Sequence, residues 1–207
     1  MEPFTKLVAK AAPLDRANVD TDQLTPARFL RRPRDKDYPD ILFHDLRFNE
    51  DGTHKPDFVL NQPAYHDSKI LVADENFGCG SSRETAVWAL YDYGFRAVIA
   101  PSFGDIFLSN CAKNGVLAVR LPADDVARLR AQLRAQVGEI RIDLAAQTVV
   151  GPDSNGTEYS FEIDAFQKHC MLNGLDDIGF TLELEATIEQ HERKHSASLP
   201  WLQTKRT

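Results

Sequence analysis

The chain has 207 residues, 43% of them hydrophobic and 27% charged, and a net charge of −7. This length suits one domain with a sizeable core, and the acidic balance argues against a nucleic-acid partner, because phosphate groups require a basic surface. No apolar run approaches the roughly 20 residues that cross a bilayer, and the N-terminus carries no secretory signal, so we expect a cytoplasmic protein without a membrane partner.

The first half of the chain contains one regular stretch after a long irregular one. Leu7 to Ala11 predicts a strand, and polar residues then form a loop. Residues 31–55 are rich in charge, proline and aromatic side chains, and we interpret them as a long, partly mobile excursion with helical turns near 39–43. An apolar, β-branched run at 68–73 predicts a buried strand, and 84–93 predicts a helix that ends at Gly94.

The second half alternates strands and helices and then changes style. The predicted elements are a strand at 96–100, a helix through Cys111 that Ser102 and Asp105 cap and that ends near Gly115, a strand at 116–119, a helix between Pro122 and Gly138, antiparallel hairpin strands at 140–144, 148–150 and 159–163, helices at 165–173 and 181–192, and a flexible tail at about 196–207. The alternation predicts an α/β fold with a mainly parallel sheet, strand–helix crossovers and an added antiparallel hairpin.

The most informative stretch is NFGCGSSRE at residues 76–84, between a predicted strand and a predicted helix. Gly78 and Gly80 allow close backbone approach, and the first N–H groups of a helix point toward bound anions. Arg83 can hold a carboxylate in a bidentate fork. The stretch therefore predicts a site for a small anionic substrate. In isolation, Ser81 and Ser82 would be interpreted as helix caps.

Several separate motifs in this chain occur in one family in the same order. They are PLDRANVDTD at 13–22, NFGCGSSRETAVWAL at 76–90, AVIAPSF at 97–103 and HCMLNGLD at 169–176. The chain thereby resembles the small subunit of 3-isopropylmalate dehydratase, which corresponds to the swivelling domain of the aconitase superfamily. The resemblance implies one swivelling β/β/α three-layer domain over residues 1–207.

The resemblance assigns roles to the Gly-Ser-Ser-Arg turn. It implies that Ser81 is the catalytic base that removes a proton from the carbon next to a carboxylate, while the hydroxyl on the neighbouring carbon leaves. Arg83 is implied as a second catalytic residue, and Ser82 and Gly80 as substrate-binding residues. Serine is a poor base in water, so this role requires helix N–H groups, the nearby arginine and exclusion of solvent.

A second group of candidates follows the first motif. Alone, DTDQLTPAR at 20–28 is typical of an aspartate-rich turn with a solvated arginine. The resemblance implies instead that Asp22 and Thr25 shape the pocket and that Arg28 binds the distal region of the substrate. The basic run that follows has two open interpretations, a solvated face or specificity contacts; it contains Arg31, Arg32 and Arg34.

The chain lacks a group that could expel hydroxide from an alcohol, which calls for a Lewis acid or a strong general acid. Cys79, Cys111 and Cys170 are far apart and fit no metal or iron–sulfur pattern, so we predict no metal bound by this chain and no disulfide framework. We expect Cys111 and Cys170 to be buried structural thiols. The resemblance implies a partner, a large subunit that carries a [4Fe–4S] cluster, and a small dicarboxylate substrate.

Three alternatives remain open from the sequence. The family motif usually continues with histidine and has proline nearby, whereas this chain has Thr85 and Val87, so a paralogous hydratase for citraconate, dimethylmaleate or homoaconitate is one alternative. A non-catalytic carboxylate-binding module is the second. The third is a cysteine-dependent hydrolase built on Cys79, because a helix N-terminus lowers the pKa of a thiol. The main hypothesis is a hydro-lyase that interconverts 2- and 3-isopropylmalate in leucine biosynthesis.

Overall fold

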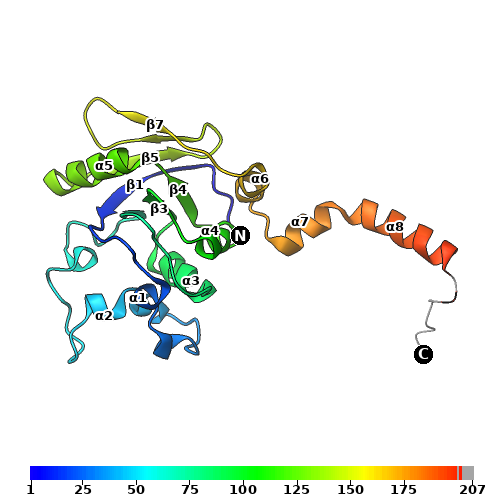
Figure 1. The fold of residues 1–207 in the computed structure, drawn as a ribbon, viewed down its shortest axis with the longest axis horizontal. Coiled ribbons are helices and arrows are strands. Elements are labelled where there is room, and N and C mark those ends of the chain that lie inside the picture. Colours follow the sequence, from blue (N-terminus) through cyan, green and yellow to red (C-terminus); the bar gives the residue numbers. More distant parts are fainter. Residues whose placement is uncertain (200, 202–207) are drawn as a thin grey trace.

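A seven-stranded sheet in the order β4-β3-β2-β1-β5-β6-β7 forms the centre of the molecule (Figure 1). The computed structural model describes residues 1–199 and 201. The strands β1 to β4 are parallel to one another, and β5, β6 and β7 continue the sheet from β1 with antiparallel pairing. In chain order the strands are β1 Lys6–Pro13, β2 Ile70–Val72, β3 Ala97–Ala100, β4 Leu117–Arg120, β5 Glu139–Asp143, β6 Thr148–Val150 and β7 Glu158–Ser160.

The helices include the crossovers that connect the parallel strands. In chain order they are α1 Thr21–Leu24, α2 His44–Arg47, α3 Glu84–Tyr93, α4 Asp105–Lys113, α5 Ala123–Ala135, α6 Ala165–Asn173, α7 Asp177–Glu183 and α8 Glu185–Ser198, with short 3-10 turns at Ala27–Phe29, Tyr38–Ile41 and Val59–Asn61. The predicted α/β class, the parallel strands and the crossovers are confirmed. The antiparallel part, predicted as a hairpin, contains all three strands β5–β7.

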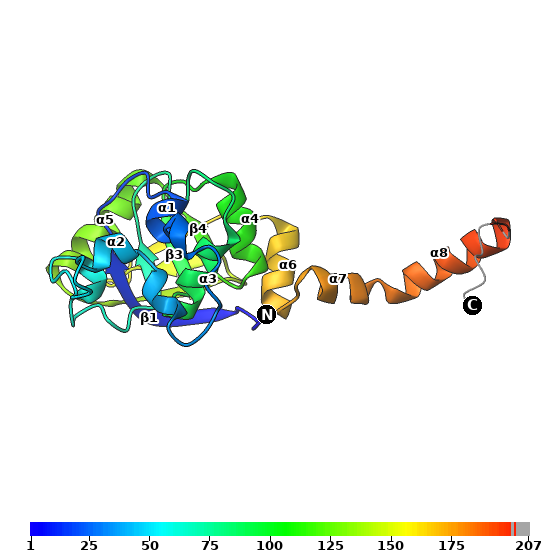
Figure 2. The same cartoon turned by 90° about the horizontal axis from the view of Figure 1, so that it is seen from below.

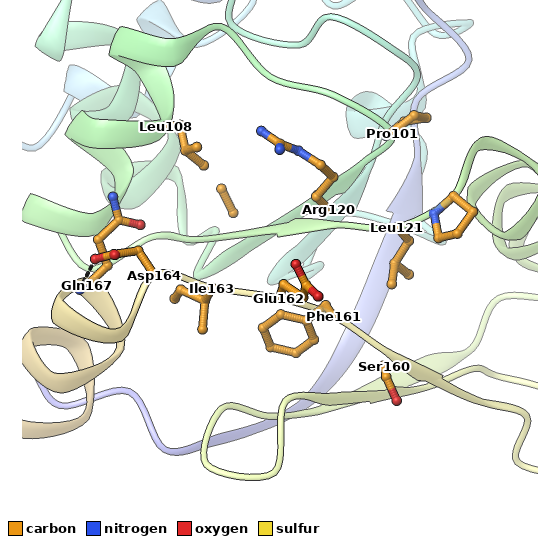
Figure 3. A pocket seen from close by; sticks show the side chains of 12 residues that line it. Pro101, Leu108, Arg120, Leu121, Ser160, Phe161, Glu162, Ile163, Asp164 and Gln167 are labelled. Carbon is orange, nitrogen blue, oxygen red and sulfur yellow. Dashed lines mark hydrogen bonds between the residues drawn. The ribbon is translucent and has the colours of Figure 1, made fainter.

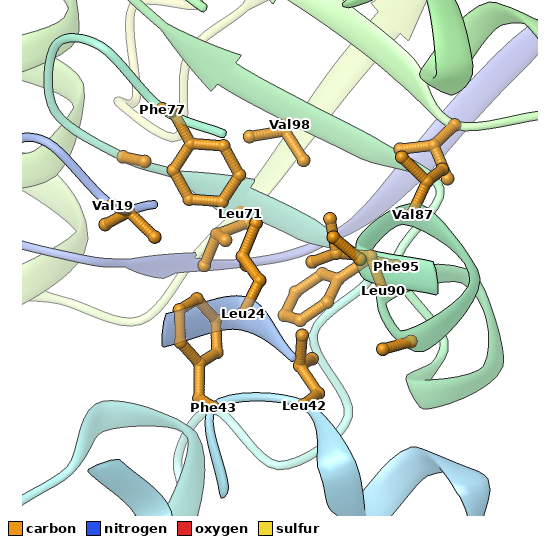
Figure 4. Packing of buried hydrophobic residues seen from close by; sticks show 14 of the residues in the cluster. Val19, Leu24, Leu42, Phe43, Leu71, Phe77, Val87, Leu90, Phe95 and Val98 are labelled. Carbon is orange, nitrogen blue, oxygen red and sulfur yellow. The ribbon is translucent and has the colours of Figure 1, made fainter. Parts of the chain in front are cut away.

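Both faces of the sheet are buried, which explains why its central strands are apolar without alternation. On one face, Leu71 and Val98 pack with α3, α4 and the segment around Phe43 (Figure 4). On the other face, Ile70 and Ile99 pack with α5 and the antiparallel strands. Since successive side chains of a strand point to opposite sides, each central strand contributes to both clusters.

The middle of the 31–55 excursion, residues 38–47, is packed against the core, whereas most of 31–37 and 49–54 is exposed. Tyr38, Ile41, Leu42 and Phe43 are at most 1% exposed and belong to the cluster beneath α3. Arg47 is also buried, and its guanidinium donates to the carbonyls of Pro39 and Leu42 at 3.1 and 3.2 Å. Charged residues dominate the composition of this segment, so its few buried apolar residues could not be recognised from the sequence.

Glycine ends two helices where the sequence predicts. Gly94 after α3 and Gly174 after α6 have φ angles of 118° and 69°, in the left-handed region that favours glycine. The predicted cap of α4 is wrong. Gly104 precedes α4 without a side-chain cap, and the Ser102 hydroxyl instead accepts a hydrogen bond from the Asn76 N–H at 2.8 Å.

The C-terminal helices α7 and α8 form an arm that leaves the body of the molecule (Figures 1 and 2). We predicted one helix at 181–192, whereas the structure has two that meet at Leu184. Helix α8 extends to Ser198, so the start of the predicted flexible tail is helical, and residues 200 and 202–207 lie outside the described part. The arm exposes large apolar side chains, including Ile178 at 71% and Leu182 at 62%.

Candidate active site

The Gly-Ser-Ser-Arg turn at residues 80–83, here called the Ser81 turn, lies in the loop between β2 and α3. The backbone of this loop requires glycine. Gly78 and Gly80 have φ angles of 73° and 90°, which side chains other than glycine rarely adopt. A β-carbon at Gly78 would also overlap the ring of Phe107 on α4. The loop therefore takes a course that few other sequences could follow, and this course brings Ser81 to the start of α3.

We predict that Gly78→Ala destabilises the chain by about 2–5 kcal/mol, the sum of left-handed strain and overpacking. Equilibrium urea unfolding would measure this free energy. Gly52→Ala is the matched control, because Gly52 has a φ of 81° but nothing within 4 Å of an added β-carbon. Gly52→Ala should carry the strain alone, about 1–2 kcal/mol. Equal losses in the two variants would contradict the steric part of the argument.

The two serines of the turn do not cap α3. Ser81 and Ser82 are both exposed, and the residue at the cap position is Arg83, where no side chain hydrogen bonds to the helix N-terminus. The interpretation of the serines as caps is therefore wrong. Two hydroxyls at the open N-terminus of a ten-residue helix are in a position to meet an anionic ligand.

Arg83 joins the turn to the second group of candidates. Its side chain is 18% exposed and forms an ion pair with Asp22 through Nη1. The same nitrogen donates to the carbonyl of Thr25 at 3.4 Å, and the buried Thr25 hydroxyl donates to the carbonyl of Thr85 at 3.5 Å. Asp22 and Thr25 thus lie beside the turn, and their role in shaping the pocket stays a prediction. Among the described residues, the contacts of the guanidinium use Nη1 alone, which leaves its other edge for a ligand.

Thr21 is a residue of the site that our reasoning from the sequence missed. It is 1% exposed, its hydroxyl donates to the carbonyl of Ser81 at 3.1 Å, and its N–H donates to the carbonyl of Cys79 at 3.0 Å. Thr21 thereby fixes the backbone of the turn from behind. It lies inside the DTD motif, so the motif contained the signal, but the motif alone did not separate Thr21 from its exposed neighbours.

Arg28 belongs to a separate group of residues. Its guanidinium makes two hydrogen bonds to Asp45, one of them at 2.9 Å, and contacts His44 Nδ1 at 3.2 Å. The arginine lowers the pKa of the Asp45 carboxyl to about 2, with His44 adding to the effect. This group borders an open cavity of about 510 Å³. No described contact joins Arg28 to Arg83, and no local pattern indicates that Asp45 and His44 hold Arg28.

The basic run after Arg28 is divided between solvent and the body. Arg31 and Arg34 are both exposed, but the Arg34 guanidinium forms a bidentate pair with Asp92 of α3 at 2.6 and 2.7 Å. The Arg34 guanidinium also lies 5.6 Å from the ring centre of Trp88. Arg34 therefore fastens the 31–55 segment to α3.

The surroundings of the cysteines do not favour a thiolate or a shared metal site. Burial raises the pKa of the Cys79 thiol, and Asp20 raises it further, which opposes the thiolate that a cysteine hydrolase needs. Cys111 and Cys170 are buried, as predicted, at 0% and 8% exposure. Within residues 1–199 and 201, no three His, Cys, Asp or Glu side chains are grouped in a way that could hold a metal ion.

A cavity of about 700 Å³ opens elsewhere, between β4 and residues 160–164 (Figure 3). Leu108, Arg120 and Phe161 are among its lining residues, and no residue of the Ser81 turn is. The turn instead lies on the surface.

In the described part of the chain, no helix has both the length and the apolar character needed to cross a membrane.

Three family models match consecutive parts of the chain. The aconitase C-terminal domain matches residues 1–124, a model described as LeuD_N matches 127–165, and the C-terminal domain of the 3-isopropylmalate dehydratase small subunit matches 177–205. The first match contains the whole Ser81 turn and its partners Asp22 and Thr25.

Similar proteins extend over the full length. The 3-isopropylmalate dehydratase small subunit of Dinoroseobacter shibae is 51% identical and covers 98% of this chain and 100% of its own, and that of Rhizobium meliloti is 50% identical over 97% and 100%. The crystal structure of the Methanocaldococcus jannaschii 3-isopropylmalate dehydratase protein LeuD has the same fold, with a TM-score of 0.66, 24% identity and coverage of 90% and 99%. The chain belongs to the family of 3-isopropylmalate dehydratase small subunits.

Proposed function

We propose that this chain is the small subunit of a cytoplasmic hydro-lyase that interconverts 2- and 3-isopropylmalate in leucine biosynthesis. The family membership supports the reaction, and the Ser81 turn supports the role of this subunit in it. Residues 1–207 act as one swivelling domain. Ser81 and Arg83 are the catalytic residues, Ser82 and Gly80 contact the substrate, and Asp22 and Thr25 shape the pocket. Arg28, from its separate group with Asp45 and His44, binds the distal region of the substrate.

One observation carries the proposal. Ser81 and Ser82 are exposed at the uncapped start of α3, beside a guanidinium that Asp22 holds by one nitrogen. These groups form one wall of a site on the exposed surface of the chain. A surface of this kind becomes an enclosed site only when another protein covers it.

The reaction moves one proton and one hydroxyl between neighbouring carbons. Ser81, as its alkoxide, accepts the proton from the carbon next to a carboxylate as the C–H electron pair forms the double bond and hydroxide leaves from the adjacent carbon. Water then adds to the alkene with the two positions exchanged: the hydroxyl binds the carbon that lost the proton, and the proton binds the carbon that lost the hydroxyl. The free edge of Arg83 binds a carboxylate of the substrate, and the start of α3 and Arg83 together stabilise the serine alkoxide, which has no such support in water.

The group that assists the departing hydroxide belongs to the partner. The three cysteines of this chain are separated in the fold and two are buried, so they do not fit a cluster site. We propose that a large subunit supplies a [4Fe–4S] cluster as the Lewis acid and closes the site over Ser81. The apolar side chains on the α7–α8 arm favour such a partner, because exposed apolar patches mark surfaces that meet other proteins.

The proposal predicts that the chain is inactive alone and active with its large subunit. The test is to purify the full chain, combine it with the cluster-loaded large subunit, and follow the absorbance of the alkene formed from 3-isopropylmalate. We expect turnover only in the mixture, with a higher kcat/KM for isopropylmalate than for citraconate, dimethylmaleate or homoaconitate.

The other outcomes separate the alternatives. A higher kcat/KM for another alkyl-substituted acid would reassign the substrate to that acid and would make Thr85 the first position to examine. Binding of isopropylmalate by the isolated chain, with no turnover in the mixture, would favour the carboxylate-binding module and overturn the proposal.

A further inference from the structure

Two segments far apart in the sequence run side by side up to the site. Residues 15–22 and 74–83, here called the site ribbon, follow β1 and β2 at the same edge of the sheet. Backbone hydrogen bonds join them in steps: the N–H groups of Asn18, Gly78 and Thr21 donate to the carbonyls of Glu75, Val19 and Cys79 at 2.9, 2.7 and 3.0 Å. The position of the Ser81 turn therefore depends on how the ribbon is held at its base.

The middle of the site ribbon is under conformational restraint. Asn18 and Asn76 both have left-handed backbones, with φ angles of 54° and 57°, and their side chains hydrogen bond to each other at 2.8 Å. Residues other than glycine adopt this region only at a cost, although asparagine tolerates it best. A restrained ribbon transmits a displacement at its base to its tip instead of absorbing it.

Arg130 of α5 holds both segments at their base. Its Nη1 lies 3.2 Å from Asp15 Oδ1, and its Nη2 lies 2.8 Å from Asp74 Oδ2. Asp15 and Asp74 are each two residues beyond the last residue of their strand, where the site ribbon begins. The Arg130 side chain is 11% exposed, so its geometry is fixed by packing.

We propose that Arg130 is a positioning residue for the active site: by binding Asp15 and Asp74 together, it sets the register of the two segments that carry Ser81 and Arg83. The inference rests on the proposed function. A planar guanidinium spans two separate carboxylates in fixed directions, whereas an ammonium is a point charge on a flexible stem.

The contacts of Arg130 are not those of a residue selected for stability alone. Its Nε is buried and has no hydrogen-bond partner within the described part of the chain, which costs free energy. The Asp15 and Asp74 side chains are 41% and 33% exposed, and ion pairs with exposed groups contribute little to stability. A role in holding two loops explains why an arginine occupies this position on a helix that otherwise contributes Val126, Leu129 and Leu133 to the core.

The test compares Arg130→Lys with Arg128→Lys in the full-length chain. Arg128 lies on the same helix, is 57% exposed and, among the residues that the structure describes, pairs only with Asp125, so it is the matched control. Hydrogen exchange should show the Asn18, Gly78 and Thr21 amides exchanging at least about tenfold faster in Arg130→Lys, with β3 unchanged. With the large subunit, kcat/KM should fall about tenfold to a hundredfold, mainly through kcat, because ångström displacements of catalytic groups cost about this much. Arg128→Lys should stay within about twofold in both measurements.

The outcomes distinguish the positioning role of Arg130 from the proposed function. Unchanged exchange in Arg130→Lys, or an unchanged kcat/KM in an active enzyme, would overturn the positioning role. So would faster exchange throughout the sheet together with a lower Tm, since that pattern marks a purely structural residue. Failure of the wild-type chain to turn over with its partner would instead count against the proposed function, and the exchange result would still decide how the site ribbon is held.

Discussion

Replacing Ser81 with alanine is expected to lower kcat about 10²- to 10⁴-fold in the reconstituted enzyme, the range that general-base catalysis contributes. KM should change little, because the hydroxyl acts on a carbon-bound proton and Arg83 still binds the carboxylate. Stability should stay within about 0.5 kcal/mol, since Ser81 is exposed. The measurement is steady-state alkene formation, with urea unfolding of the isolated variant beside it.

Ser82→Ala is the matched control for Ser81→Ala, because Ser82 carries the adjacent hydroxyl and is also exposed. If Ser82 contacts the substrate, Ser82→Ala should raise KM by less than about thirtyfold, because one lost hydrogen bond costs at most roughly 2 kcal/mol of binding free energy. The variant should keep kcat near its wild-type value. If Ser81→Ala retained full turnover, or if the two variants behaved alike, the assignment of the base to Ser81 would be wrong.

Arg83→Lys should lower kcat/KM roughly tenfold to a hundredfold, the equivalent of the 1.5–3 kcal/mol that a hydrogen bond to a charged group contributes. Lysine keeps the charge but cannot bind Asp22 with one nitrogen while it presents a second to a carboxylate. The loss should appear mainly in KM, with kcat falling less than in Ser81→Ala. Initial rates over a range of isopropylmalate concentrations would separate the two constants.

Asp22 provides the internal check on this prediction. If Asp22 acts by orienting Arg83, then Asp22→Asn should lower kcat/KM in the wild-type background and have little effect in the Arg83→Lys background. A double-mutant cycle measures this coupling, for which we expect about 0.5–3 kcal/mol. Additive losses would mean that Asp22 acts independently of Arg83.

The elements predicted well from sequence are those whose signals are local. The apolar run at 70–72, the glycine stops after α3 and α6, and the glycine–serine turn each depend on a few neighbouring residues. Their physics is the choice of backbone angles and the period of a strand or helix, which a single sequence carries. The assignment of Asp22 and Thr25 to the pocket came instead from the family resemblance, and their contacts with Arg83 came from the structure.

The rest depended on contacts between distant residues. Nothing near Arg28 indicates Asp45 as its partner, and nothing near Arg130 indicates that it spans Asp15 and Asp74. The 31–55 segment misled us for the same reason, because four buried apolar residues outweigh its many charges only when α3 is there to cover them. The boundary between α7 and α8 at Leu184 has no glycine or proline to mark it.

The stepwise pairing of residues 15–22 with 74–83 has a consequence for how this sequence can change. An insertion of one residue in either segment would shift that segment along the other by about 3.3 Å, the rise of an extended residue. That slip is several times the misplacement that a reacting group tolerates. Lengthening of one segment is therefore acceptable only if the other lengthens with it, so we expect the spacing from Asp15 to Thr21 and the spacing from Asp74 to Ser81 to change only together.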